Sequence, residues 1–265
     1  MNRTAAFDHI ATGYDASFID TLTGWEQRLQ VRRHLQVFLT GKRNLQILEI
    51  NCGTGEDALW LAQMGHTVIA TDQSPVMIQQ AQLKNLNQSV QFVTCSIEDL
   101  EDQFAGQQFD LVFSNFAGLN CLSPEKIKTF HQQLQNLLYP DGHFAVVLFG
   151  KYTLWETCYY LLRLQVGPAF RRWTSKALQV PLTAGVHQPV WYYSTGQFKK
   201  LFPRMRLSGK KPVGMLVPPS YLEAAMQKRP RFFKWLARMD QKLIGRTALA
   251  TLADHTYLLF KKNIA

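Results

Sequence analysis

Carboxylates and glycines are concentrated in residues 49–57 of this 265-residue chain, whose sequence there is Glu-Ile-Asn-Cys-Gly-Thr-Gly-Glu-Asp. Gly53 and Gly55 lack a Cβ atom, so the backbone can turn sharply and approach a ligand closely. The segment therefore predicts a loop that binds a nucleotide-like cofactor. The pair of glycines alone is a weak signal, because Ala58 stands where a full G-x-G-x-x-G pattern has its third glycine.

A further carboxylate, Asp72, follows the next apolar run, 23 residues after Glu49. At the end of a strand it could accept hydrogen bonds from both hydroxyls of an adenosine ribose. A dinucleotide and S-adenosylmethionine both fit this spacing. Glu49, Glu56 and Asp57 would repel a pyrophosphate, whereas they would attract a sulfonium and an ammonium. The local charge therefore favours S-adenosylmethionine.

The elements that must position these residues alternate between strands and helices. Apolar runs predict strands over residues 46–50, 67–71, 90–95, 109–114 and 143–149, the last one after a turn over 139–142. Helices are predicted over 56–64, 75–85 and 124–138, with Ser74 and Pro75 at the start of the second. Strands separated by such helices favour parallel pairing in a doubly wound sheet, whose ligand lies at the carboxyl ends of the strands.

The chain resembles the class I, Rossmann-like, S-adenosylmethionine-dependent methyltransferases over residues 7–150, and more loosely at its last strand. The glycine-rich loop of that family reads acidic-x-Gly-x-Gly-x-Gly, and here it is Glu49-x-Asn51-x-Gly53-x-Gly55. Asn51 can replace the first glycine because asparagine adopts left-handed conformations more readily than most residues. The resemblance implies an α/β fold: a doubly wound, mostly parallel seven-stranded sheet with helices on both faces and an inserted helical lid.

The same resemblance implies roles for particular residues. Asp72 would bind the ribose, and Gln73 and Met77 would line the adenosine. Ser96 and Ile97 lie in the segment after the third strand that contacts the adenine in this family. Asn115 and Phe116 would lie near the reactive methyl group. The segment with Phe7, Asp8, Tyr14 and Asp15 resembles the amino-terminal helix of the family, and its tyrosine, Tyr14, would close over the methionine part of the cofactor. The implied cofactor-binding set is Tyr14, Glu49, Asn51, Gly53, Gly55, Asp72, Gln73, Met77, Ser96, Ile97 and Asn115.

The second half of the chain has a different composition. Residues 1–150 carry 9 Lys and Arg against 15 Asp and Glu, a net charge of 9 − 15 = −6, and residues 151–265 carry 20 against 4, a net charge of 20 − 4 = +16. We expect helices over 154–164, 169–177, 195–202 and 231–244, and extended segments over 189–194, 205–210 and 256–261. Residues 1–150 would form the cofactor-binding core, and residues 151–265 the rest of the sheet and a lid, within one structural domain.

The basic second half leaves several partners open. Its charge could attract nucleic acid, an anionic membrane surface, an acidic carrier protein or an anionic substrate, or could be a solvated face without a partner. The cysteines, Cys52, Cys95, Cys121 and Cys158, form no C-x-x-C pair, and neither a secretory signal nor a membrane-spanning run precedes or follows them. We therefore expect reduced thiols, no metal site and a cytoplasmic protein, with association at a membrane surface left open. The oligomeric state is not predicted.

The acceptor is predicted from what is missing and from what is abundant. No Asn-Pro-Pro-Tyr or Asp-Pro-Pro-Tyr follows residues 109–114, where enzymes that methylate the amino group of a nucleic-acid base stack that base. No cysteine follows a proline, as it does in the enzymes that methylate carbon 5 of cytosine. Both kinds of base methylation therefore lose support. Many aromatic residues in the second half favour a hydrophobic small molecule, methylated on oxygen. The candidate general bases for a hydroxyl acceptor are His187, His255, Tyr192 and Tyr193, of which His187 is chosen. The favoured alternative for His255 is a packed or strand-edge histidine beside Asp254, and for Tyr192 and Tyr193 a hydrophobic lining of the lid. An RNA methyltransferase and a non-catalytic cofactor-binding or membrane-recruited protein remain the alternatives.

Overall fold

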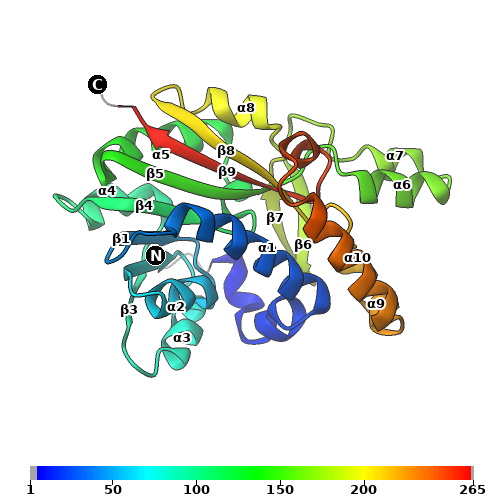
Figure 1. Ribbon diagram of the computed structural model, residues 1–265, viewed down its shortest axis with the longest axis horizontal. Coiled ribbons are helices and arrows are strands. Elements are labelled where there is room, and N and C mark those ends of the chain that lie inside the picture. The colour runs from blue at the N-terminus through cyan, green and yellow to red at the C-terminus, as the bar shows by residue number, and fades with distance from the viewer. Residues whose placement is uncertain (1–4, 264–265) are drawn as a thin grey trace.

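The computed structural model describes residues 5–263, in which strands and helices alternate up to residue 149 (Figure 1). The strands are β1 (Gln46–Ile50), β2 (Thr67–Asp72), β3 (Val90–Thr94), β4 (Phe109–Ser114), β5 (Leu138–Phe149), β6 (Leu178–Thr183), β7 (Val186–Val190), β8 (Met205–Val213) and β9 (His255–Lys262). The α-helices are α1 (Leu22–Leu39), α2 (Glu56–Gln63), α3 (Pro75–Lys84), α4 (Leu100–Gln103), α5 (Pro124–Leu137), α6 (Leu154–Leu162), α7 (Val166–Ala169), α8 (Thr195–Lys200), α9 (Glu223–Gln227) and α10 (Pro230–Leu243).

Seven strands form one sheet in the order β3-β2-β1-β4-β5-β9-β8. The five strands from β3 to β5 pair in parallel, whereas β9 is antiparallel to both of its neighbours. The strand order reverses between β1 and β4, so the loops that follow these two strands open a crevice at the carboxyl edge of the sheet. The predicted doubly wound, mostly parallel seven-stranded sheet is confirmed, and β8 and β9 come from the second half.

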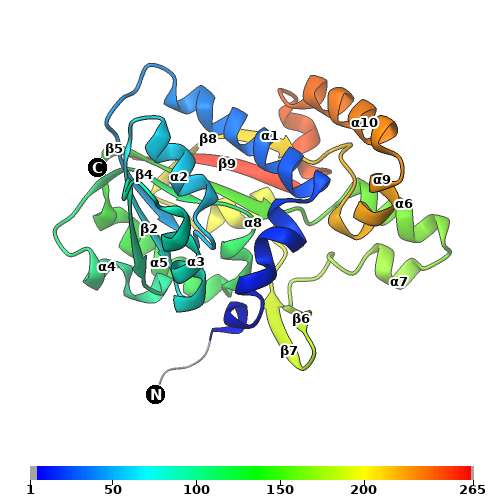
Figure 2. The same cartoon turned by 90° about the horizontal axis from the view of Figure 1, so that it is seen from below.

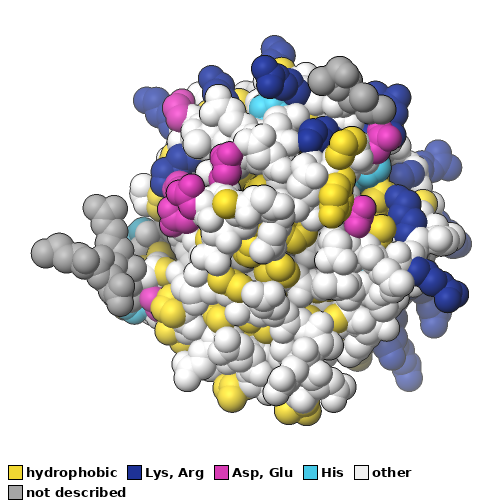
Figure 3. Space-filling model, turned by 90° about the vertical axis from the view of Figure 1, so that its left-hand side faces the viewer, with side chains coloured by type: hydrophobic (Ala, Val, Ile, Leu, Met, Phe, Trp, Pro, Cys, Tyr) yellow, Lys and Arg dark blue, Asp and Glu magenta, His cyan; other side chains and the backbone are white. Residues whose placement is uncertain are grey.

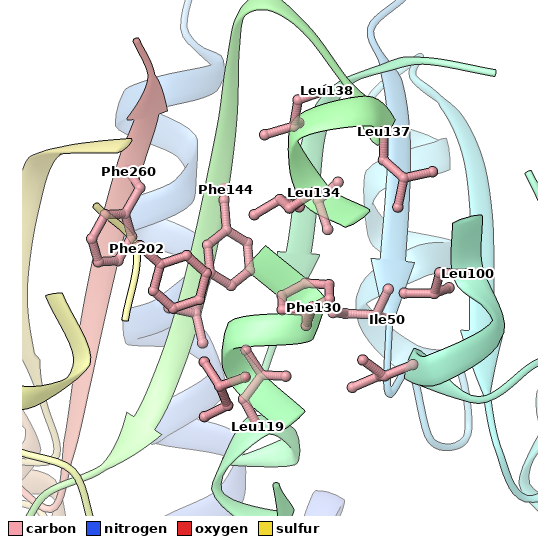
Figure 4. Close-up of a cluster of buried hydrophobic side chains, with 14 of the residues drawn as sticks. Ile50, Leu100, Leu119, Phe130, Leu134, Leu137, Leu138, Phe144, Phe202 and Phe260 are labelled. Carbon is pink, nitrogen blue, oxygen red and sulfur yellow. The ribbon is translucent and has the colours of Figure 1, made fainter. Parts of the chain in front are cut away.

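Successive side chains of each central strand enter the cores on opposite faces of the sheet. Ile47 packs with apolar residues of α1, α2 and α3, and its neighbour Leu48 packs with those of α4, α5 and α8. Rings of Phe144, Phe202 and Phe260 fill the second core, with the first two stacked 5.4 Å apart (Figure 4). Close packing of this kind fixes the strand ends relative to one another.

The segment between β5 and β8 is only partly helical. The predicted helix over residues 169–177 is wrong: α7 ends at Ala169, and residues 170–177 form turns. The arginines at 171 and 172 are drawn inward by the buried carboxylate of Glu156, a tertiary interaction that local sequence does not reveal. The hairpin β6–β7 was not predicted, and only residues 189–190 of the expected extended segment belong to β7.

Two further differences concern the first half. The 18-residue helix α1 was not predicted; it packs on the sheet and runs alongside α10 (Figure 2). The turn expected over residues 139–142 lies within β5, where Asp141 has a φ of 65° and pairs with Lys261. No helix within residues 5–263 is long and apolar enough to span a membrane.

Candidate active site

A cavity of about 780 Å³ lies at the carboxyl ends of β1, β2 and β4. Its walls come from the loops after these strands, the amino-terminal segment before α1, the hairpin β6–β7, and residues 171–172, 191–192, 219–221 and 254–255. Ligand pockets span about 300–1,000 Å³, so the cavity has room for a cofactor and a small acceptor side by side. Nothing in the described part of the chain groups three or more His, Cys, Asp or Glu side chains as a metal would need.

The two glycines of the loop after β1 have different tasks. The amide of Gly53, at the cavity wall, donates a hydrogen bond of 3.0 Å to Asp72. Gly55 does not line the cavity; it has a φ of 82°, and a Cβ there would lie 2.6 Å from the ring of Phe92. Gly55 is therefore required by the left-handed start of α2 and by packing, rather than by ligand contact.

Asn51 occupies the position of the missing glycine and has the expected left-handed backbone, with a φ of 55°. Its side chain donates to the hydroxyl of Ser114 at 3.3 Å, which ties the loop after β1 to the end of β4. A Cβ at Gly118 would lie 2.4 Å from the Asn51 amide nitrogen. The loops after β1 and β4 thus meet through an asparagine and a glycine at one point of the cavity wall.

The adenosine end of the predicted site is formed at β2 and after β3. Asp72, Gln73, Met77 and Ile97 line the cavity, but Ser96 does not. The Ser96 hydroxyl instead donates to Asp99 at 2.7 Å, which directs it away from the cavity. Neighbouring Ile97 lines the cavity.

Oppositely charged side chains meet where the loop after β1 enters α2, and Arg28 of α1 lines the cavity there. The buried Asp57 pairs with Arg28, with Arg32 at 3.0 Å and with the amide of Asn115 at 2.7 Å. Although burial raises the pKa of the Asp57 carboxyl, the two arginines hold that pKa below its ordinary value. For Glu49, burial and the nearby Asp57 raise the pKa well above its ordinary value.

The expected cofactor fits this end of the cavity by charge. Two buried polar atoms, Glu49 Oε2 and Arg28 Nε, have no hydrogen-bond partner among the described residues, and both side chains line the cavity. An ammonium beside Glu49 and a carboxylate beside Arg28 would satisfy both atoms, since buried polar groups are normally paired. The methionine part of S-adenosylmethionine carries these two groups.

The amino-terminal segment covers the loop through polar contacts. Asp15 accepts from the hydroxyl of Thr54 at 2.5 Å and pairs with Lys84, and Asp8 accepts from Ser74. Tyr14 lines the cavity next to Gly53, and burial raises the pKa of its phenol to about 12. Residues 6–19 form short 3-10 and π-helical turns rather than the single expected helix.

The loop after β4 has an unusual backbone. Phe116 and Ala117 both have positive φ values, 44° and 64°, which are costly for residues with a Cβ. The ring of Phe116 packs 5.1 Å from that of Phe18 and 5.7 Å from that of His255, with the Arg28 guanidinium 4.8 Å from its centre. The strained loop thus holds an aromatic ring in the middle of the cavity wall.

His187, the candidate general base, is not brought to the cavity. It lies exposed on β7, and the lining residues are its neighbours Gln188, Pro189 and Val190. His187 is thus exposed outside the cavity, although the three residues that follow it line the wall. The catalytic role expected for His187 is therefore not retained.

His255 is buried beside Asp254, as expected of a packed histidine, and it also lines the cavity at the start of β9. Its Nδ1 lies 3.4 Å from Asp254 Oδ2, and its ring packs 4.9 Å from that of Phe149. Asp254 also accepts from Gln27 at 3.1 Å and lies 3.4 Å from Arg172. Burial alone would raise the pKa of Asp254, but His255 and Arg172 hold that pKa well below its ordinary value.

The arginines of residues 171–172 bring positive charge to the same end. Arg172, which is buried, pairs with Glu156 at 2.6 Å, and its guanidinium lies 5.1 Å from the ring centre of Tyr192. Arg171 pairs with Glu156 through two hydrogen bonds of 2.6 and 3.2 Å. Tyr192 lines the cavity, whereas Tyr193 donates to the carbonyl of Leu122 at 2.6 Å and belongs to the core.

Arg28, Arg172 and Gln27 were not predicted as site residues. A signal for Arg28 existed: Arg28 and Arg32 are four residues apart, on one face of a helix, and the loop at residues 49–57 carries three carboxylates in need of cations. No local pattern identifies Arg172, because its partners Glu156 and Asp254 are 16 and 82 residues away in sequence.

Comparison with known proteins agrees with this geometry. Residues 47–142 match the family model of a methyltransferase domain. A protein from Listeria monocytogenes proposed to be an S-adenosylmethionine-dependent methyltransferase superimposes with a TM-score of 0.62 over 89% of this chain and 100% of its own, at 12% sequence identity. At that identity the likeness shows the fold.

Three curated relatives match shorter stretches. An uncharacterised methyltransferase of Synechocystis is 32% identical over 42% of this chain and 50% of its own length. A tRNA 5-carboxymethoxyuridine methyltransferase of Escherichia coli is 25% identical over 56% and 58%, and a 2-heptyl-1-hydroxyquinolin-4(1H)-one methyltransferase of Mycobacteroides abscessus is 25% identical over 44% and 52%. The chain thus spans about half the length of the curated relatives that it matches.

Proposed function

We propose that this chain, which belongs to the class I, Rossmann-like, S-adenosylmethionine-dependent methyltransferases, methylates a hydroxyl group of a hydrophobic small molecule. The observation that carries the proposal is the pair His255 and Asp254 at the acceptor end of the cavity. Residues 1–150 would hold the cofactor, and residues 151–265 would supply the lid over the acceptor.

The cofactor would lie along the carboxyl edge of the sheet. Asp72 would bind the ribose, Arg28 the carboxylate and Glu49 the ammonium of the methionine part, with Tyr14 closing over it. When bound, S-adenosylmethionine supplies a methyl group on a positively charged sulfur. Alignment of the acceptor and exclusion of water can then provide much of the rate.

The acceptor would lie between Phe149, Trp191 and Tyr192, whose rings line the other end of the cavity. Nδ1 of His255 lies 3.4 Å from Asp254 Oδ2 without a hydrogen bond in this structure. If that contact closes to a hydrogen bond when the acceptor binds, Nε2 is left to accept the hydroxyl proton while the new O–C bond forms and the C–S bond breaks. Asp254 would stabilise the resulting imidazolium, and the proton would then pass to solvent. A negative group on the acceptor would find Arg171 and Arg172 beside it.

The test measures S-adenosylhomocysteine formation with a panel of hydrophobic phenols and hydroxyquinolones. His255→Gln should lower kcat by about a hundredfold or more without changing the affinity for S-adenosylmethionine. Raising the pH should restore part of the rate, because an ionised hydroxyl needs no base. His187→Gln is the matched control and should keep full activity. Equal rates for His255→Gln and the wild type would contradict the role of His255.

RNA is the second candidate acceptor, supported by the relative that acts on tRNA and by the cationic second half. It predicts steeply salt-dependent RNA binding and methyl transfer to tRNA lacking the modification. The third candidate is a non-catalytic protein that binds the cofactor. In such a protein, lid side chains would fill the space beside the methyl group, and the cavity of about 780 Å³ argues against this. An acidic carrier protein and an anionic membrane surface both remain candidate partners of the basic half.

A further inference from the structure

Large apolar side chains are exposed on α6, α7 and the turns beside them. Seven of the sixteen exposed large hydrophobic side chains of residues 5–263 lie between residues 154 and 173. Leu162 and Leu164 are 86% and 90% exposed, and Val166 and Trp173 are 61% and 52% exposed. We call residues 154–173 the apolar tip. A cluster of this size on a protein surface marks a site of contact with another apolar phase or partner.

The tip is an ordered structure with its apolar residues held outward. Leu164 has a φ of 59°, which is rare for a bulky side chain, and its amide donates to the carbonyl of Leu161 at 2.9 Å. The amide of Gln165 donates to Tyr160 at 2.9 Å. These bonds close the turn between α6 and α7, so the most exposed leucine stands at the outer end of a defined loop. Both views show α6 and α7 projecting from one end of the molecule (Figures 1 and 2).

The outer face of α10 adds stacked aromatic rings and cations at the same end. Phe232 and Trp235 are about half-exposed, and their rings lie parallel with centroids 5.9 Å apart. The opposite face packs Phe233 and Leu236 into a small core that also receives Trp155 of α6. The helix thus joins the tip and presents a mixed aromatic and cationic surface. Its exposed cations are Arg231, Lys234, Arg238 and Lys242.

The surface charge of this half is more one-sided than its sequence suggests. Of the four carboxylates in residues 151–265, Glu156, Asp240 and Asp254 are buried. Glu223 is partly buried and accepts hydrogen bonds of 2.8 and 3.1 Å from the first amides of α1. The exposed ionic groups that residues 151–265 contribute around the tip are therefore mainly cations, including Arg163, Arg171 and Lys176. The opposite end of the molecule, in contrast, displays both acidic and basic side chains (Figure 3).

We propose that the apolar tip and the outer face of α10 dock on the surface of an anionic lipid bilayer. Cations attract the lipid headgroups, and the leucines of the tip enter the boundary between headgroups and acyl chains. The aliphatic side chains distinguish this partner from RNA, because leucine adds nothing to phosphate binding, whereas acyl chains remove it from water.

Docking would place the acceptor end of the cavity near the lipid. Tyr221 lines the cavity, and its ring lies 5.2 Å from that of Tyr159 on α6. Arg171, at the base of the tip, lines the cavity as well. Uptake of a hydrophobic acceptor from the membrane rests on the proposed function; the docking itself does not.

The experiment is sedimentation of the full chain with phosphatidylcholine vesicles, with and without phosphatidylserine, in the absence of cofactor and acceptor. The wild type should sediment with the anionic vesicles, and less so as salt rises. Leu162→Gln with Leu164→Asn should weaken partitioning by about tenfold or more. The matched control is Leu83→Gln with Leu86→Asn, two leucines that are 67% and 87% exposed on another part of the surface.

The control double variant should bind as the wild type does, and unchanged thermal unfolding would show that both variants are folded. No sedimentation of the wild type with anionic vesicles would overturn the proposal, as would equal partitioning of the two double variants. Binding of polyuridylate without binding of vesicles would overturn it in favour of RNA. Because no methyl transfer is measured, failure here is distinct from failure of the proposed reaction.

Discussion

The carboxylate of Asp72 accepts a hydrogen bond of 3.0 Å from the amide of Gly53, so the end of β2 holds the loop after β1. Its other oxygen accepts from the amide of Ser74 at 2.9 Å. Although these two bonds lower the pKa of Asp72, burial raises it above its ordinary value. The residue proposed to bind the ribose therefore also sets the shape of the loop that the cofactor must enter.

Replacing this carboxylate should weaken cofactor binding. For Asp72→Asn we expect the Kd for S-adenosylhomocysteine to rise about ten- to a hundredfold, since hydrogen bonds to a charged group contribute about 1.5–3 kcal/mol. Isothermal titration measures it. Asp110→Asn is the matched control, because Asp110 accepts from the amide of Gln46 at the other end of β1 and does not line the cavity. An unchanged Kd for Asp72→Asn would remove Asp72 from the site.

Arg28→Gln should separate the two ends of the cofactor site. The variant removes the cation proposed to bind the carboxylate of the methionine part and leaves the ribose end intact. We expect the affinity for S-adenosylhomocysteine to fall about tenfold or more, and that for adenosine to stay the same. Arg33→Gln, on the same helix and outside the cavity, controls for the loss of charge. Equal losses for both ligands would indicate that Arg28 acts only through the fold.

The sequence predicts the sheet better than the lid. Strands β1 to β4 are short, mostly apolar segments whose side chains enter both cores. Ser74 caps α3 by accepting a hydrogen bond of 3.1 Å from the amide of Met77, as its position before Pro75 predicts. In the hairpin β6–β7, Thr183 pairs with Val186 across a two-residue turn, but Pro181 and Pro189 within its strands weaken the strand signal.

The site was predictable where a residue follows directly from a strand end. Asp72, Asn51 and Asn115 stand there, and the structure brings all three to the cavity. The acceptor end depends on register: His187 and His255 both lie on strands of the lid half, and only the side to which each strand turns its residues decides which one reaches the cavity. That side is set by pairing, which a single sequence does not show.

The contact between Asn51 and Gly118 predicts a coupled pair of substitutions. A Cβ in Gly118→Ala would lie 2.4–2.7 Å from the Asn51 side chain, so the loops after β1 and β4 must shift. We expect a loss of about 1–3 kcal/mol in the free energy of unfolding, with weaker cofactor binding. Asn51→Gly removes the clash and keeps a residue suited to a φ of 55°. The double variant should therefore recover stability; additive losses in urea unfolding would contradict the coupling.

A buried histidine predicts how stability depends on pH. His34 donates through Nε2 to the carbonyl of Pro212 at 2.9 Å, and burial lowers its pKa to about 4. The unfolded chain binds this proton below a pH of about 6.5, while the folded chain excludes it down to a pH of about 4. The free energy of unfolding should therefore decrease as the pH is lowered across that range. At a pH of about 5 it should be about 2 kcal/mol lower than at neutral pH.

His34→Gln isolates this contribution, since a glutamine amide can donate to the same carbonyl but does not titrate. Between a pH of about 6.5 and about 4, the free energy of unfolding from urea titrations should decline less steeply in the variant, by about 1.4 kcal/mol per pH unit. His143, whose pKa burial also lowers to about 4, would maintain a residual slope. His187→Gln, at an exposed position, should retain the wild-type slope. The same slope in His34→Gln as in the wild type would mean that His34 takes up its proton without unfolding the chain.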